Sequence, residues 1–114
     1  MSRPWRLTRQ AETSLFEIAL WTVETFGPRQ AAAYEEDLLA HCREIAVGTA
    51  ITQGCRQLID PDLPEDLRFA RSGQHFIVVI EDAAQVIIVD FLHARSDLPG
   101  KIAALSSTKT QNNH

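Results

Sequence analysis

The sequence predicts an α+β fold in which an antiparallel helical hairpin packs on one face of a four-stranded antiparallel sheet. Apolar residues recur every three or four positions across residues 11–45, the period of helices, whereas residues 67–93 hold short apolar runs separated by turn-forming residues. A chain of 114 residues is about one domain long, so helices and strands must share a core. We expect a single domain over residues 1–105 and a disordered polar tail over residues 106–114, which lack apolar periodicity.

The first element is a short strand in "RPWRLT". Trp5 and Leu7 alternate with Arg6, as in a strand with two different faces. Pro4 has no N–H to donate, so it marks an edge strand or the start of a strand. Thr8 suits the N-cap position of the helix that follows.

Two helices come next, each with one apolar face. Gly27 and Pro28 separate them, because glycine can end a helix in a left-handed conformation and proline suits the first helical position. So tight a break folds the helices into an antiparallel hairpin, whose apolar faces need a common third layer. The residues expected on those faces are Ala11, Leu15, Ile18, Thr22 and Phe26 in the first helix, and Ala31, Tyr34, Leu38, Cys42 and Ile45 in the second.

A loop over residues 47–65, with two glycines and two prolines, leads to three strands, "DLRFARS", "HFIVVIE" and "VIIVDFLH". Short connections favour an antiparallel meander. The second and third of these strands are apolar without alternation, so both faces of the sheet need cover, and the hairpin covers only one. The other face is covered either by "DLPGKIAAL", with Leu98, Ile102 and Leu105 on one side of a short helix, or by another protein.

Composition argues against several classes of function. The formal net charge is −4, and the only lysines are Lys101 and Lys109, so specific or generic nucleic-acid binding is not expected. Cys42 and Cys55 lack the spacing of a zinc site, and we expect no metal and no cofactor. The apolar runs are too short to cross a membrane, and the N-terminus has no signal-peptide pattern, which favours the cytoplasm.

The order of elements resembles the toxins of the RelE/ParE superfamily of bacterial toxin–antitoxin modules, and within it the ParE branch. The resemblance covers residues 5–95. It rests on "RLTRQAETSLFEIALWTVETFG", on "QAAAYEEDL", on the strand pair "DLRFARSGQHFIVVIE" and on the last strand "VIIVDFLHAR" with its exit through His93 and Arg95.

This resemblance implies the toxin of a type II module, neutralised by a ParD-like antitoxin and inhibiting DNA gyrase, and so replication, without catalysis. The superfamily also implies an alternative, a RelE-like endoribonuclease that cleaves mRNA on the ribosome. A third possibility is an inactive member that only binds its antitoxin. The acidic net charge departs from the basic charge that is usual in the family.

The nuclease alternative needs an acid–base group and cations around a phosphate. His93, Arg95 and Arg71 are the candidates, with Arg68 and His75 nearby in the strands. Against this alternative, the only tyrosine, Tyr34, lies in the second helix. The lysines of RelE-type enzymes have no counterpart in residues 1–100.

Strand alternation separates the polar residues of "VIIVDFLHARSD". It places His93 on the face of Val89 and Phe91, and Asp90 on the opposite face, so the two cannot act as a pair unless the strand is broken. Asp90, among apolar neighbours, needs a partner. Arg68, Arg6 or a basic residue of the antitoxin are the candidates, with an ion pair inside the protein favoured.

A partly uncovered apolar sheet with arginines beside it is a suitable binding surface for an acidic amphipathic helix. The apolar side chains of such a helix would contact the sheet, and its carboxylates would bind the arginines. We therefore expect the antitoxin or the target to bind a surface that includes eight residues: Arg6, Arg68, Arg71, Asp90, His93, Arg95, Leu98 and Ile102.

Overall fold

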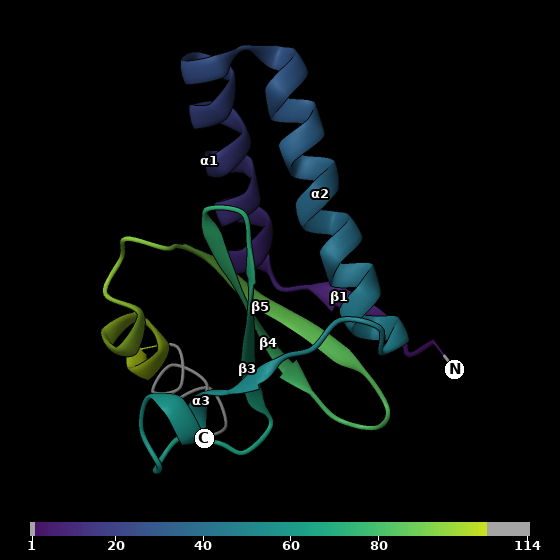
Figure 1. Ribbon diagram of the computed structural model, residues 1–114, viewed down its shortest axis with the longest axis vertical. Coiled ribbons are helices and arrows are strands. Elements are labelled where there is room, and N and C mark those ends of the chain that lie inside the picture. Colours follow the sequence, from purple (N-terminus) through teal and green to yellow (C-terminus); the bar gives the residue numbers. More distant parts are fainter. Residues whose placement is uncertain (1, 105–114) are drawn as a thin grey trace.

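Two long helices pack on one face of a five-stranded mixed sheet in the computed structural model (Figure 1). The structure describes residues 2–104, without the side chain of residue 58. In chain order the elements are β1 (Trp5–Leu7), α1 (Arg9–Phe26), α2 (Pro28–Val47), β2 (Gln53–Gly54), α3 (Cys55–Leu58), β3 (Leu67–Ser72), β4 (His75–Glu81) and β5 (Val86–His93). A helical segment at residues 98–104 ends the described part, so Leu105 and the expected tail at 106–114 lie outside it.

The predicted α+β class, with a helical hairpin on a sheet, is confirmed, while the sheet differs in two details. β1 pairs with β5 in parallel, and β2 adds a fifth strand beside β3, in the order β1-β5-β4-β3-β2. A strand of three residues shows alternation but nothing that fixes its direction of pairing. The two residues of β2 are too few to show any period.

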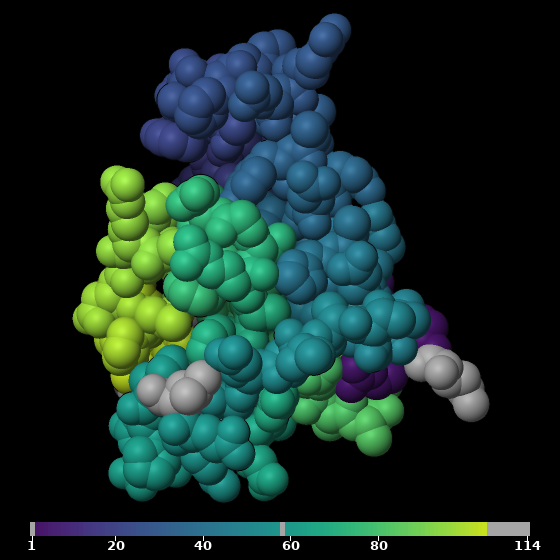
Figure 2. All heavy atoms as spheres, viewed as in Figure 1, coloured from purple at the N-terminus to yellow at the C-terminus, as the bar shows by residue number. Residues whose placement is uncertain are grey.

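The hairpin begins and turns where the sequence indicates. The Thr8 hydroxyl accepts a hydrogen bond from the Ala11 N–H and donates one to the Val89 carbonyl, so this N-cap also fastens α1 to β5. Gly27, with a φ of 95°, joins the helices directly. Figure 2 shows the far end of the hairpin projecting beyond the rest of the molecule.

α1 is much less buried than α2. Ala11 and Thr22 are its only buried residues, and five large apolar side chains of α1 are exposed: Phe16, Leu20, Trp21, Val23 and Phe26. Phe26, expected in the core, is 56% exposed because it is the last residue of α1, and this end of the hairpin projects beyond the sheet (Figure 1). α1 therefore carries more apolar surface than its own chain covers.

The second face of the sheet is covered by the chain itself, the first of the two alternatives. Ile102 is fully buried and Leu98 is partly buried against β3, β4 and β5, together with Cys55 and Leu63. An acidic helix therefore finds no open apolar sheet here. None of the described helices combines the length and apolar character needed to cross a bilayer.

A β-bulge interrupts β5 in its middle. Val78 pairs with Asp90 while the next residue, Val79, pairs with Ile88, so Val89 is an extra residue in the strand. Ile88 and Phe91, three residues apart, consequently lie in one core cluster, below the helices. The alternation predicted for β5 is therefore wrong across this bulge, and it resumes from Asp90 to His93.

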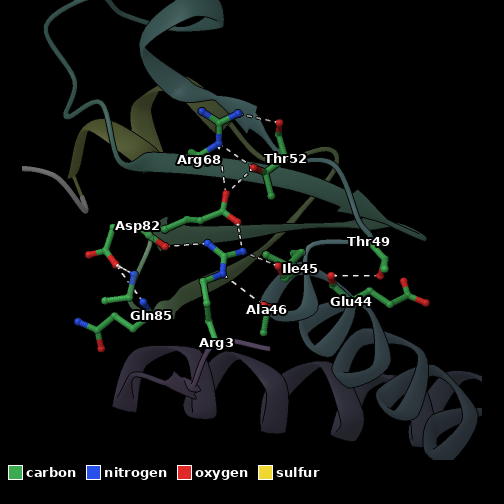
Figure 3. A network of polar contacts seen from close by, with 11 residues as sticks. Arg3, Glu44, Ile45, Ala46, Thr49, Thr52, Arg68, Asp82 and Gln85 are labelled. Carbon is green, nitrogen blue, oxygen red and sulfur yellow. Dashed lines mark hydrogen bonds and ion pairs between the residues drawn. The ribbon is translucent and has the colours of Figure 1, made fainter. Parts of the chain in front are cut away.

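Arg3 joins the N-terminus, α2 and the sheet (Figure 3). Its guanidinium donates to the carbonyls of Ile45, Ala46 and Asp82 and forms an ion pair of 2.8 Å with Glu81. Arg68 binds the other oxygen of Glu81 at 3.4 Å and the Thr52 hydroxyl at 2.7 Å. The guanidinium thus adds a donor to the carbonyls of Ile45 and Ala46 at the end of α2, which also accept the backbone N–H groups of Gly48 and Arg3.

Candidate functional site

A groove of about 620 Å³ lies between the hairpin and the end of the sheet where β4 begins and β5 ends. α1 contributes an aromatic wall, since Trp21 and Phe26 pack edge to face at 5.9 Å and each is 56% exposed. The remaining lining is mostly polar: Thr22, Gln30, Ala33, Tyr34, Asp37, Gln74, His75, His93 and Arg95. A second hollow of about 400 Å³ continues from Trp21, His75 and His93 toward Ser14 and Glu17 on α1.

The turn between β3 and β4 brings Tyr34 to the floor of the groove. Gly73 adopts a φ of 60°, and a Cβ at this position would lie 2.8 Å from Cε1 of Tyr34. Glycine therefore permits both the left-handed turn and the close approach of the ring. The Gln74 N–H then donates to the Tyr34 oxygen at 2.9 Å.

Tyr34, His75 and His93 form a polar row. The Tyr34 oxygen accepts the Gln74 N–H and forms a hydrogen bond of 2.6 Å with Nδ1 of His75. The Ser72 carbonyl, at 3.4 Å, is a second acceptor for the Tyr34 hydroxyl. Nδ1 of His93 accepts the Arg95 N–H at 3.0 Å, and the two imidazole rings meet edge to face at 5.1 Å.

Burial keeps Tyr34 and His75 uncharged at neutral pH. Desolvation, with a smaller contribution from neighbouring His93, lowers the pKa of His75 to about 4. Desolvation also raises the pKa of Tyr34, although the Gln74 N–H opposes it. The floor of the groove thus offers neutral hydrogen-bonding groups between aromatic walls.

The three residues of the nuclease alternative are not brought together. His93 and Arg95 line the groove, whereas the Arg71 guanidinium lies 5.6 Å from the centre of the Phe76 ring, which packs with the second face of the sheet. Arg71 also donates to the Gly73 carbonyl at 3.1 Å. Arg95 is accompanied in the groove by the carboxylate of Asp37.

Asp90 has a hydroxyl partner and not the expected arginine. Its carboxylate, in a residue 5% exposed, accepts from the Ser14 hydroxyl at 2.5 Å and from the Phe91 N–H at 2.8 Å. Desolvation raises the pKa of Asp90 despite these two bonds. Arg68 is bound in the Thr52 and Glu81 network instead, and Arg6 is exposed on β1.

The bulge also changes which face Asp90 occupies. Because Val89 is the extra residue, Asp90 pairs with Val78 of the second-face cluster and does not share the face of Ile88, while its carboxylate reaches Ser14 of α1. Pairing is regular from Asp90 to His93, which agrees with the prediction that these two side chains project from opposite faces. His93 lies in the hollow that Ser14 lines. Phe91 lies between them, and each has its own partners.

The eight residues expected to bind the antitoxin or target lie in different parts of the molecule. His93 and Arg95 remain accessible in the groove, and Arg6 and Arg71 are exposed elsewhere. Asp90 and Ile102 are buried, Leu98 is half-buried, and Arg68 belongs to the Figure 3 network. The expectation missed the aromatic wall of Trp21 and Phe26. A signal for it exists, because the first helix holds more large apolar residues than one buried face can accommodate.

The fold and the groove define a class of small α+β proteins in which a helical hairpin stands on a mixed sheet above a binding groove. Among the residues that the structure describes, no group of three or more His, Cys, Asp or Glu is arranged to hold a metal ion. A profile of the family described as "ParE toxin of type II toxin-antitoxin system, parDE" matches residues 5–98. The chain belongs to this ParE toxin family.

The fold is also found in a solved structure. A chain of the chromosomal ParDE toxin–antitoxin system from P. aeruginosa superimposes with a TM-score of 0.66 at 14% sequence identity, over 82% of this chain and 98% of that chain. At this identity the likeness establishes the fold. A comparison with curated protein sequences finds no match.

Proposed function

We propose that the protein inhibits DNA gyrase as a non-catalytic toxin and is neutralised by a ParD-like antitoxin. The observation that carries this proposal is the family match, which extends over residues 5–98 and so includes every helix and strand from β1 to β5. Its place of action would be the cytoplasm, where gyrase works on the bacterial chromosome.

The groove favours binding over RNA cleavage. Cleavage needs cations around the scissile phosphate, whereas the lining of this groove includes one arginine, Arg95, and one carboxylate, Asp37. His75 is committed to Tyr34 through Nδ1, and Nδ1 of His93 accepts the Arg95 N–H. Exposed aromatic side chains beside neutral hydrogen-bonding groups are instead typical of protein-binding surfaces.

We place the antitoxin in this groove, with an apolar side chain against Trp21 and Phe26 and a carboxylate against Arg95. Trp21→Ser should weaken antitoxin binding by about tenfold or more, because buried aromatic anchors dominate such interfaces. The matched control is Ile51→Ser, at a loop position that is 88% exposed and lies outside the groove. Equal affinity of the two variants, measured by titration calorimetry, would place the antitoxin elsewhere.

The choice between inhibitor and nuclease is tested with purified protein. DNA supercoiling by gyrase should stop at stoichiometric toxin and recover when the product of the adjacent reading frame is added. Primer extension on translated mRNA should show no new cuts. Codon-dependent cuts that disappear in His93→Ala would establish the nuclease, and a protein that binds its antitoxin but has neither effect would be an inactive member.

A further inference from the structure

The outer side of α1 carries an apolar stripe that the groove does not use. Phe16, Leu20 and Val23 are 68%, 49% and 40% exposed. On a helical wheel of 100° per residue, these three side chains lie within an arc of about 60° around the axis of α1. The arc faces away from the buried Ala11 and Thr22. Spacings of four and three residues are those of a helix–helix contact.

Glutamates border this stripe on both sides. Glu17 and Glu24, seven residues apart, follow one edge, and Glu12 lies on the other, one turn before Phe16. All three are exposed, and Arg9 is the only cation in α1. The hairpin as a whole, residues 9–47, holds three arginines and seven carboxylates, and this excess of four negative charges equals the formal net charge of the chain.

We propose that the outer face of α1 docks an amphipathic helix from another protein, with apolar residues at spacings of four and three and with lysines or arginines on both flanks. Its apolar residues would cover Phe16, Leu20 and Val23. Its cations would meet Glu12, Glu17 and Glu24, while their aliphatic stems extend the apolar contact. This surface goes beyond the proposed function, since its apolar stripe lies outside the groove, meets the adjoining hollow only at Glu17, and needs neither gyrase nor the antitoxin.

Charge decides among the possible occupants of the stripe. A second copy of this chain would bring glutamate against glutamate along the whole contact, which is unfavourable. An acidic helix, a nucleic acid and an anionic membrane surface are disfavoured for the same reason. A basic helix satisfies both the apolar stripe and its acidic borders.

The test uses two synthetic helical peptides with leucines at spacings of four and three, one flanked by lysines and the other by glutamates. Each is titrated calorimetrically into the full-length protein. We expect the lysine peptide to bind about tenfold tighter or better, and its affinity to fall as salt screens the charges. Equal affinities, or tighter binding of the glutamate peptide, would overturn the proposal.

Two variants locate the binding. Leu20→Ser should abolish binding of the lysine peptide, and the double change Glu17→Lys with Glu24→Lys should transfer the preference to the glutamate peptide. Both positions are exposed, so circular dichroism should show an unchanged fold, and Ile51→Ser is the control for loss of an exposed apolar residue. Binding that survives Leu20→Ser would overturn the proposal, as would self-association that Leu20→Ser abolishes in sedimentation.

Discussion

Two arginine–carboxylate pairs separate the effect of burial on stability from the effect of distance. Arg43 and Glu36 lie closer, at 2.6 Å, but their side chains are 49% and 65% exposed. Arg3 and Glu81 are 2.8 Å apart and only 21% and 16% exposed, and Arg3 also donates to three backbone carbonyls. If distance alone decided, the Arg43 pair would contribute more to stability. If burial and hydrogen bonding decide, the Arg3 pair contributes far more.

The expected magnitudes follow from these surroundings. Arg43→Ala should cost at most about 0.5 kcal/mol, because solvent screens an exposed pair. Arg3→Ala should cost about 2–3 kcal/mol, because it removes the side-chain donor from the carbonyls of Ile45, Ala46 and Asp82 and leaves Glu81 with Arg68 as its remaining cation. The loss of stability is smaller than for a fully buried pair, because the Arg3 side chain is partly exposed to solvent.

Urea unfolding of the two variants beside the wild type measures the difference. At an ordinary slope, a loss of 2–3 kcal/mol moves the midpoint of Arg3→Ala down by about 1–2 M. Arg43→Ala should unfold within about 0.3 M of the wild type. Similar midpoints for both variants, or a larger loss in Arg43→Ala, would refute the argument that burial decides.

Three further predictions concern the groove and the bulge. Because the pKa of His75 is about 4 when folded and about 6.5 when unfolded, the unfolded chain takes up the proton first, so stability is full above pH 6.5 and falls toward pH 4. Between pH 7 and pH 5, the free energy of unfolding should fall by about 1–2 kcal/mol less in His75→Asn than in the wild type, as measured by urea titrations at each pH. Parallel pH profiles of the two proteins would contradict this. Ser14→Ala should lower the free energy of unfolding by about 1–3 kcal/mol at pH 7, because it removes a donor from the Asp90 carboxylate. The decrease should be smaller in acid, where Asp90 takes up a proton. A decrease that does not change with pH would count against this prediction. Gly73→Ala should lower the free energy of unfolding by at least about 1 kcal/mol, since φ is 60° and Tyr34 fills the space of the Cβ; a thermal midpoint equal to the wild type would disprove it.

The sequence alone predicts the helices and the meander well, because their signals are local. Thr8 and the pair Gly27–Pro28 mark where the helices begin and turn, and the structure places them as expected. Leu98 and Ile102 could also be expected to cover the second face, since an apolar strand without alternation requires cover on both sides. Such features depend on residues a few positions apart.

The bulge was not predictable from the residues of β5. Val89 and Asp90 carry no glycine or other local mark of an extra residue, so a period of two appeared to hold along the whole strand. The shift arises from pairing with β4, where Val78 and Val79 face Asp90 and Ile88. This one residue shifts the alternation between Ile88 and Phe91, while the Ser14 hydroxyl of α1 takes the place of the expected arginine beside Asp90.

The groove depends on contacts between distant segments. Tyr34 and His75 are 41 residues apart and meet only because the Gly73 turn folds against α2. His93 and Arg95 were identifiable as an accessible pair at the strand exit, but their aromatic neighbours Trp21 and Phe26 come from the far end of α1. Local patterns name the polar residues of this site, and the tertiary fold decides which of them share it.

The most direct test of the proposed function is a supercoiling assay with purified gyrase, relaxed plasmid, the full-length protein and the product of the adjacent reading frame. We predict that supercoiling stops as the toxin reaches the concentration of gyrase and resumes when the antitoxin is added in equal amount. Supercoiling that continues unchanged at a large excess of correctly folded, antitoxin-binding toxin would contradict gyrase inhibition.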